Sequence, residues 1–201
     1  MNRHLFLILM FLSTFSSYAQ DYTISIGEEV LDIELEREYS ININGEEVKF
    51  NVRTKDTLTL ESEIFSFSYP KDYKISRIDL GDGVFQFMVI NGEGSGYMIQ
   101  EYTNMSPSML NEIMLNELTK ESINYGFKLE RQDYVKKLND GMEVNVDKAV
   151  LTYKDETNIY EIMSIGKKDE GIMVITMSMD ANLSAEGQKL ISMMWDSLTL
   201  K

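Results

Sequence analysis

The stretch Phe65-Ser66-Phe67-Ser68-Tyr69-Pro70 decides how the rest of the chain is interpreted. Three aromatic residues alternate with two serines, and a period of two predicts a β-strand with one buried face. The aromatic side chains are expected on the buried side and the two serines on the other. Proline has no N–H to donate to a ladder, so the strand should bend or end at Pro70.

Alternating runs separated by glycine-rich turns predict further antiparallel strands downstream. We expect them at residues 72–78, 84–90, 97–102, 127–138, 142–154, 159–166 and 172–179. Residues 84–90 are apolar on both faces, which is typical of a strand inside a covered sheet. In 142–154 the apolar parity shifts between Val146 and Ala149, so a β-bulge is expected near Asp147-Lys148.

Two helices are predicted within this series of strands. Ser106-Pro107 has the composition of a helix start and Gly126 that of a helix stop. The second helix should run from Ser184 to Trp195. Apolar residues at helical spacing predict the buried stripe of each helix: Leu110, Ile113, Met114 and Leu118 in the first, and Leu190, Ile191, Met194 and Leu198 in the second.

The chain begins with a pattern typical of a secretory signal peptide at residues 1–19. Arg3 precedes an apolar run from Leu5 to Leu12, and Ser17-Tyr18-Ala19 has the small-x-small form of a cleavage site. The run is much shorter than the roughly 20 residues that a bilayer requires. We therefore expect cleavage after Ala19, no membrane insertion afterwards, and a periplasmic or secreted product.

Residues 20–60 are expected to form an N-terminal β-hairpin segment. Asn44-Gly45 lies between two alternating runs, and this pair is the strongest short hairpin signal because both residues tolerate positive φ. The sequence therefore predicts three parts: the signal peptide, this segment, and one larger domain over 61–201.

Composition excludes several kinds of chemistry and partner. The chain has no cysteine, and its single histidine, His4, lies in the predicted signal peptide. A thiolate nucleophile, a serine-type triad and an imidazole- or sulfur-ligated metal site are therefore not expected, and we predict no cofactor and no metal site. The formal net charge is −14, so nucleic acid is a poor partner.

The element order from Glu63 onward resembles the α/β/α sandwich family of PsbP-like and DcrB-like proteins. The resemblance rests on the opening Phe65–Pro70, the glycine-flanked hairpin, the Ser106-Pro107 helix start and the ending Trp195-Asp196-Ser197-Leu198. It covers about residues 61–201. For these residues it implies an α+β fold, with an antiparallel β-sheet flanked by helices. The resemblance also implies a non-catalytic role in binding or assembly. The N-terminal β-hairpin extension lies outside the resemblance and is predicted from the Asn44-Gly45 pattern alone.

The loop Gly92-Glu93-Gly94-Ser95-Gly96 invites comparison with a phosphate-binding loop, but a strand follows it where a nucleotide fingerprint requires a helix. A hairpin tip that contacts a partner is the functional alternative. The candidate contact residues are Asp82, Glu93, Ser95 and Tyr97. The acidic clusters coincide with turns and lack the spacing of a calcium loop. Most methionines fall on predicted core stripes, and Met105 and Met109 are the exceptions that suggest an adaptable binding surface.

These observations favour an exported, non-catalytic binding or assembly module of the bacterial envelope. Its partner is expected to be another envelope or secreted protein. Two other functions remain open from the sequence. One is a carboxylate-based hydrolase or carbohydrate-binding protein, which requires two acids converging in a cleft. The other is an immunity-type protein whose acidic surface neutralises a delivered effector. The sequence does not specify an oligomeric state.

Overall fold

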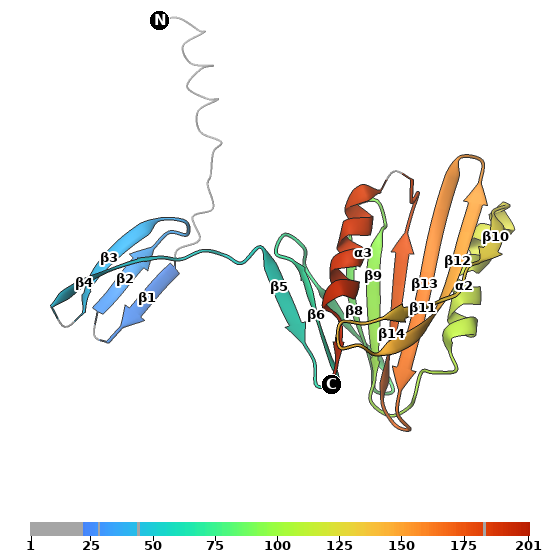
Figure 1. Cartoon of the computed structure of the whole chain (residues 1–201), viewed down its shortest axis with the longest axis horizontal. Helices are drawn as coiled ribbons and strands as arrows, with labels where there is room; N and C mark the ends of the chain where they lie inside the picture. The colour runs from blue at the N-terminus through green and yellow to red at the C-terminus, as the bar shows by residue number, and fades with distance from the viewer. Residues whose placement is uncertain (1–21, 28, 44, 183) are drawn as a thin grey trace, which may run out of the picture. The chain divides into compact units, whose positions relative to one another are not determined.

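The computed structural model describes residues 22–27, 29–43, 45–182 and 184–201, and the expected signal peptide with its cleavage site lies outside them. The described chain forms two compact units, divided between Lys55 and Asp56 (Figure 1). Residues 57–60, which the sequence grouped with the N-terminal segment, are part of the strand Thr57–Glu61, which pairs with Phe65–Pro70 and belongs to the larger unit.

The smaller unit consists of two antiparallel hairpins. They are β1 (Tyr22–Ile26) with β2 (Glu29–Ile33), and β3 (Glu38–Ile43) with β4 (Glu46–Asn51). The second hairpin is the one predicted from Asn44-Gly45. Ile33 and Ile41 are buried, and the ring of Tyr39 stacks on that of Phe50 at 5.9 Å. The Tyr39 hydroxyl accepts a hydrogen bond from the backbone N–H of Glu34 at 2.8 Å, so this ring links the two hairpins.

The larger unit is built on an antiparallel sheet of eight strands, here called the main sheet. Its order is β10-β12-β13-β14-β9-β8-β7, and β11 also pairs with β12. The strands are β7 (Ser76–Gly81), β8 (Val84–Ile90), β9 (Gly96–Tyr102), β10 (Lys128–Arg131), β11 (Tyr134–Lys137), β12 (Glu143–Tyr153), β13 (Glu156–Gly166) and β14 (Gly171–Ser178).

A separate three-stranded sheet, called the small sheet, has the order β15-β6-β5. Its strands are β5 (Thr57–Glu61), β6 (Phe65–Pro70) and β15 (Thr199–Leu200). The expected burial of Phe65 and Phe67 is confirmed, since they are 0% and 1% exposed. β6 is not a strand of the main sheet. Its aromatic face packs onto the main sheet instead of pairing with its edge.

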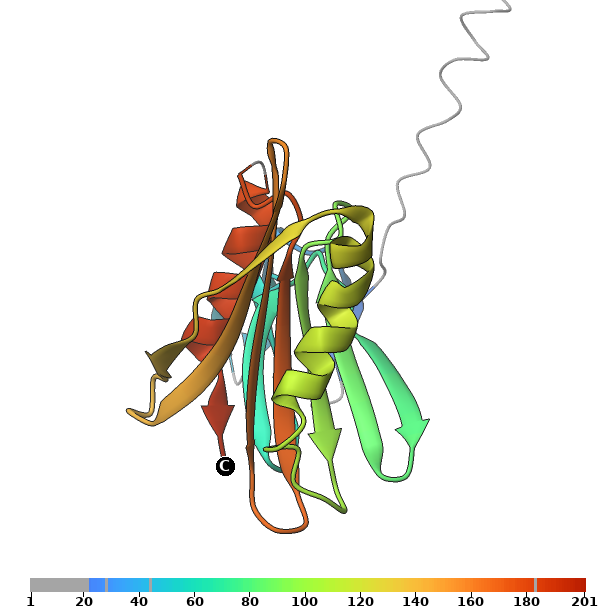
Figure 2. The same ribbon diagram turned by 90° about the vertical axis from the view of Figure 1, so that its right-hand side faces the viewer.

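Two helices are described, α2 (Asn111–Tyr125) and α3 (Ala185–Ser197), and they lie on opposite faces of the main sheet (Figure 2). Two apolar clusters fill the space between the layers. One lies between the main sheet, α3 and the small sheet, and the other lies between the main sheet and α2.

The expected α/β/α sandwich is therefore wrong as a fold class. Strands take up 53% of the described residues and helices 16%, so the chain is mostly antiparallel β. Each face of the main sheet carries one helix, but the two helices alone do not cover the sheet. On the side of α3 much of the covering layer is the small sheet, because β6 brings its own row of aromatic side chains to that face.

The first helix begins later than predicted. Ser106-Pro107 forms a turn, in which the carbonyl of Pro107 accepts a hydrogen bond from the N–H of Leu110 at 2.8 Å, and the helix starts at Asn111. The end at Gly126 is confirmed, with a φ of 112° that favours glycine. Leu115 is buried although the predicted stripe left it out, and Ile113 of that stripe is 63% exposed.

The predicted β-bulge near Asp147-Lys148 is wrong. β11 and β10 pair with β12 in one continuous register, from Tyr134↔Val146 to Arg131↔Ala149. The parity of burial changes because the two halves of β12 bury opposite faces. Val144 and Val146 face the cluster beneath α3, whereas Ala149 and Leu151 face the cluster beneath α2.

Candidate ligand-binding site

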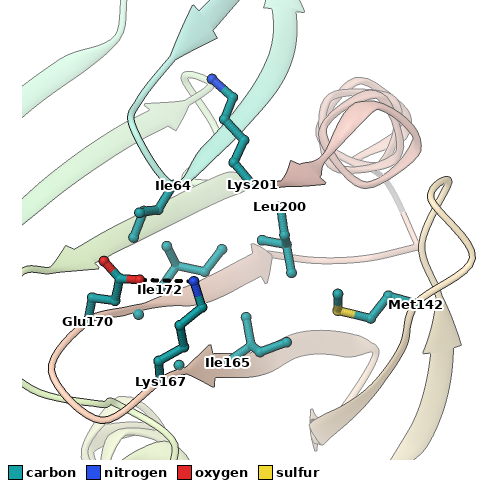
Figure 3. Close-up of a pocket in the computed structure, with 10 residues that line it drawn as sticks. Ile64, Met142, Ile165, Lys167, Glu170, Ile172, Leu200 and Lys201 are labelled. Atoms are coloured by element: carbon teal, nitrogen blue, oxygen red, sulfur yellow. Dashed lines mark hydrogen bonds and ion pairs between the residues drawn. The ribbon is translucent and has the colours of Figure 1, made fainter.

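A pocket of about 270 Å³ lies where one end of the main sheet meets the small sheet. Its lining is mostly aliphatic. Figure 3 shows the side chains of Leu200, Ile165 and Met142 around one space, with Ile64 and Ile172 beside it. The pocket draws on four parts of the larger unit: the residue before β6, the loop before β12, the β13–β14 hairpin, and β15 with Lys201. A concave, mainly apolar site with a few polar groups is the usual form of a ligand-binding site.

The β13–β14 hairpin supplies one wall of this pocket, and two glycines hold its end close to the rest of the unit. Gly166 pairs with Gly171 across the hairpin. A Cβ on Gly171 would lie 2.5 Å from Cδ of Pro107 and 2.6 Å from the carbonyl oxygen of Ile165. The hairpin therefore packs against the Ser106-Pro107 turn at a distance that only glycine allows.

β15 is an edge strand of the small sheet. Its pairing with β6 directs the backbone N–H and C=O of Leu200 toward the unpaired edge. Thr199 pairs with Ser66 and Leu200 with Phe65, and the N–H of Lys201 donates to the carbonyl of Ile64 at 2.9 Å. Hydrogen-bonded and non-hydrogen-bonded pairs alternate in an antiparallel ladder. Leu200 is in a non-hydrogen-bonded pair, so its N–H and C=O point away from β6, while its side chain lines the pocket.

Two ion pairs lie at the pocket. The Lys167 ammonium is 3.2 Å from the Glu170 carboxylate, and this pair is drawn in Figure 3. Lys201 Nζ donates to Glu61 Oε2 at 2.6 Å and to the carbonyl of Ser62 at 2.8 Å. Both pairs are exposed enough to exchange partners with a ligand at small cost, because solvent screens them.

The loop predicted to contact a partner is hydrogen-bonded to the rest of the larger unit. The side-chain oxygen of Asn91 accepts from the N–H groups of Glu93 at 3.0 Å and Ser95 at 2.9 Å. Ser95 is fully buried, and its hydroxyl accepts from the N–H of Met179 at 2.9 Å. Glu93 is exposed, and it accepts a hydrogen bond from the Ser184 hydroxyl at 2.6 Å. This loop therefore holds the start of α3.

Tyr97 is fully buried, with its ring edge against Phe67 at 5.4 Å. Burial raises the pKa of its hydroxyl, and that hydroxyl has no hydrogen-bond partner within the described chain. Asp82 is exposed in the β7–β8 turn with a φ of 49°. Of the four predicted contact residues, only Asp82 and Glu93 are on the surface, and the structure brings neither of them to the pocket.

Gly187 shows how closely α3 packs on this loop. A Cβ at this position would lie 2.3 Å from Cβ of Ser95 and 2.5 Å from Oγ of Ser184. Alanine is the better helix former by about 1 kcal/mol. We nevertheless expect Gly187→Ala to lower the free energy of unfolding by about 1–2 kcal/mol, because overpacking of a tight contact costs more than the helix gains.

Urea denaturation measures this effect, with Lys189→Ala at an exposed position of the same helix as the control. The control should change stability by about 0.5 kcal/mol or less. A stabilised Gly187→Ala protein would show that the helix start is not held against Ser95.

Three carboxylates converge around Arg131, and this arrangement bears on the alternative that the protein is a carboxylate-based hydrolase. Glu112, Asp133 and Asp147 all pair with Arg131, at 2.9, 3.0 and 3.1 Å. Burial alone would lower the pKa of Arg131, but hydrogen bonds to Glu112 and Asp133 raise it overall. A guanidinium bound by three carboxylates forms a structural ion-pair network, and it occupies the place between the acids that a scissile bond would need.

Sequence reasoning did not find the pocket. Its lining residues are aliphatic and lie at strand ends, in a turn and in a loop, so their pattern matches that of ordinary core residues. Among the described residues, no group of His, Asp and Glu side chains is arranged to hold a metal ion. The helices of the described ranges are too short or too polar to cross a bilayer.

No protein-family model matches the sequence, and no curated protein matches it. The solution structure of cyanobacterial PsbP from Synechocystis sp. PCC 6803 is similar to this chain at 8% identity with a TM-score of 0.45, over 73% of this chain and 93% of that one. A crystal structure from Bacteroides thetaiotaomicron VPI-5482 is similar at 14% identity with a TM-score of 0.33, over 68% of this chain and 45% of that one. The first is the resemblance stated from the sequence, and neither assigns a function to this chain.

Proposed function

We propose that this chain is an exported, non-catalytic binding module that captures an extended segment of another envelope protein. The pocket beside β15 is the binding site in this proposal. The observation that supports this proposal most directly is the aliphatic pocket of about 270 Å³ next to Leu200, a residue of the edge strand β15. Export is supported by the signal-peptide pattern of residues 1–19. A non-catalytic role is supported by the absence of cysteine and by the position of the single histidine, His4, within that pattern.

The chemistry of the site favours a peptide over a polar metabolite. The space suits one or two apolar side chains, and Met142 supplies a flexible thioether that adapts to different shapes. Next to this space, the N–H and C=O of Leu200 point away from β6. A peptide segment in extended conformation fits both features of the site. Its backbone pairs with the free N–H and C=O of the edge strand, while alternate side chains enter the apolar pocket.

Site-specific photo-cross-linking in the cell tests this proposal. A benzophenone amino acid at position 142, where Met142 is 39% exposed, should give one discrete adduct with an envelope protein. The matched control is the same residue at position 80, where Leu80 is 51% exposed on β7. Position 80 should give no adduct with the same protein.

A second variant separates pocket binding from a chance encounter. Leu200→Glu places a carboxylate in the apolar pocket, and we expect it to remove the adduct at position 142 while circular dichroism shows a folded protein. Equal adducts at positions 142 and 80, or an adduct that persists in Leu200→Glu, would rule out the pocket as the binding site.

A further inference from the structure

A second surface, distinct from the pocket, lies on the face of the main sheet that carries α2. It is a groove of about 630 Å³ between the turn before α2, the first turn of α2, and the strands β11 and β12. We call it the acidic groove. Val135 of β11 and Met109 of the turn line it. Ile113 is not a lining residue and lies beside the groove in the first turn of α2.

The apolar residues of this surface are unusually open to solvent. Met109 is 89% exposed, Ile113 63% and Val135 59%. Single exposed apolar residues are common on proteins, but two in one groove, with a third on the adjoining turn of α2, indicate an interaction site. Met109 is one of the two methionines that the sequence singled out as possible contacts, and its exposure is consistent with that role.

The charged side chains around the groove that are most exposed to solvent are mainly carboxylates. Arg131 is the cation shared by Glu112, Asp133 and Asp147, so three carboxylates surround one guanidinium. The side chain of Arg131 is 32% exposed, whereas those of Glu112 and Asp133 are 64% and 48% exposed. An approaching molecule therefore meets the carboxylates before the guanidinium.

One buried polar atom at the groove also lacks a partner within the described chain. Asn111 donates through Nδ2 to Asp147 at 2.8 Å, but its buried Oδ1 accepts no hydrogen bond. Asn111 lines the groove. A buried acceptor without a partner is costly, which favours a rotation of the Asn111 side chain toward a donor group on a molecule bound in the groove.

We propose that the acidic groove binds a cationic amphipathic helix of a partner protein. The apolar side of that helix covers Met109, Ile113 and Val135, and its lysine or arginine residues pair with Glu112, Asp133 and Asp147. Charge complementarity selects a cationic partner, and the exposed apolar side chains select one whose charges lie on a single face. This inference does not depend on the pocket beside β15, because it uses a different surface and a different kind of segment.

Binding of a synthetic probe tests the inference without knowledge of the natural partner. The probe is a helical peptide of about 18 leucine and lysine residues with all leucines on one face, which spans about five turns. Calorimetric titration should give saturable binding that weakens as salt is raised. A peptide of the same composition with the leucines spread around the helix should bind at least about tenfold more weakly, since it cannot cover the apolar residues.

Two variants with the same change in net charge distinguish docking of the peptide in the groove from general electrostatic attraction between the peptide and the acidic protein. Val135→Lys removes an apolar contact and adds a repelling charge in the groove, and it should weaken binding by at least about tenfold. Leu80→Lys changes an exposed residue of β7, at the opposite edge of the main sheet, and should weaken binding by no more than about twofold.

Equal losses in the two variants, or equal affinity for the two peptides, would overturn the proposal, because the protein would then attract cations without a defined site. Sedimentation of the free protein tests whether a second copy of this chain, and not a partner helix, occupies the groove. Self-association that Val135→Lys abolishes would assign this face to a second copy of the chain and would equally overturn it.

Discussion

Replacing Phe67 with alanine is expected to lower the free energy of unfolding by about 3–5 kcal/mol, because both the transfer of the ring and the cavity left behind cost free energy. Phe67 is 1% exposed. Its ring lies parallel to that of Phe65 at 6.1 Å and meets the ring of Tyr97 edge-on at 5.4 Å. Phe67 therefore joins the small sheet to β9 of the main sheet, and urea denaturation at equilibrium measures its contribution.

The neighbouring residue Ser66 supplies the matched control. It lies on the other side of the same strand and is partly exposed. Ser66→Ala should change stability by about 0.5 kcal/mol or less, as an ordinary surface substitution does. If both variants lost the same small amount, β6 would not be packed on the main sheet, and the two-layered arrangement on this face would be wrong.

Replacing Leu115 with alanine is expected to cost about 2–5 kcal/mol of stability. Leu115 is 2% exposed and belongs to the cluster between α2 and the main sheet. Ile113, two residues earlier on the same helix, is 63% exposed. Ile113→Ala should therefore change stability by about 0.5 kcal/mol or less.

This pair of variants tests the orientation of α2 directly, because the sequence and the structure disagree about it. The stripe predicted from the sequence buries Ile113 and omits Leu115. Thermal or urea unfolding that showed the larger loss for Ile113→Ala would support the sequence prediction and contradict the observed helix orientation.

The sequence predicted most strands of the larger unit, because apolar alternation and glycine-rich turns are local signals. It predicted the burial of Phe65 and Phe67, but it did not predict the sheet to which their strand belongs. Alternation determines the face of each side chain and carries no information about the partner strand. The partner on one side of β6 is Thr199–Leu200, a two-residue strand that follows α3 and is too short to give a periodic signal.

The errors at Asp147-Lys148 and at Ser106-Pro107 have a common cause. In both places a local pattern was interpreted without knowledge of what covers each part of the sheet. β12 needs no extra residue, because different layers cover its two halves. Ser106-Pro107 has the composition of a helix start, but this turn packs against the end of the β13–β14 hairpin at Gly166 and Gly171.

The candidate binding sites were less accessible from sequence than the fold. Glycine and small polar residues made the Gly92–Gly96 loop stand out, and the structure uses them to hold α3. The pocket residues are aliphatic and come from distant parts of the chain, so no spacing connects them. Met109 is the exception, because its position beside the predicted helix start and off the predicted stripe was a local signal of exposure.

Methyl NMR tests most directly whether the pocket beside β15 is where this protein binds its partner. The probe is a synthetic peptide with the sequence of the segment cross-linked at position 142, titrated into the protein labelled at methionine, isoleucine and leucine methyl groups. We predict saturable shifts of the Met142, Ile165 and Leu200 signals, with those of Leu58 and Leu80 unchanged. Unchanged signals from the three pocket residues at saturating peptide, or shifts confined to Met109 in the acidic groove and Ile113 beside it, would contradict the proposed binding site.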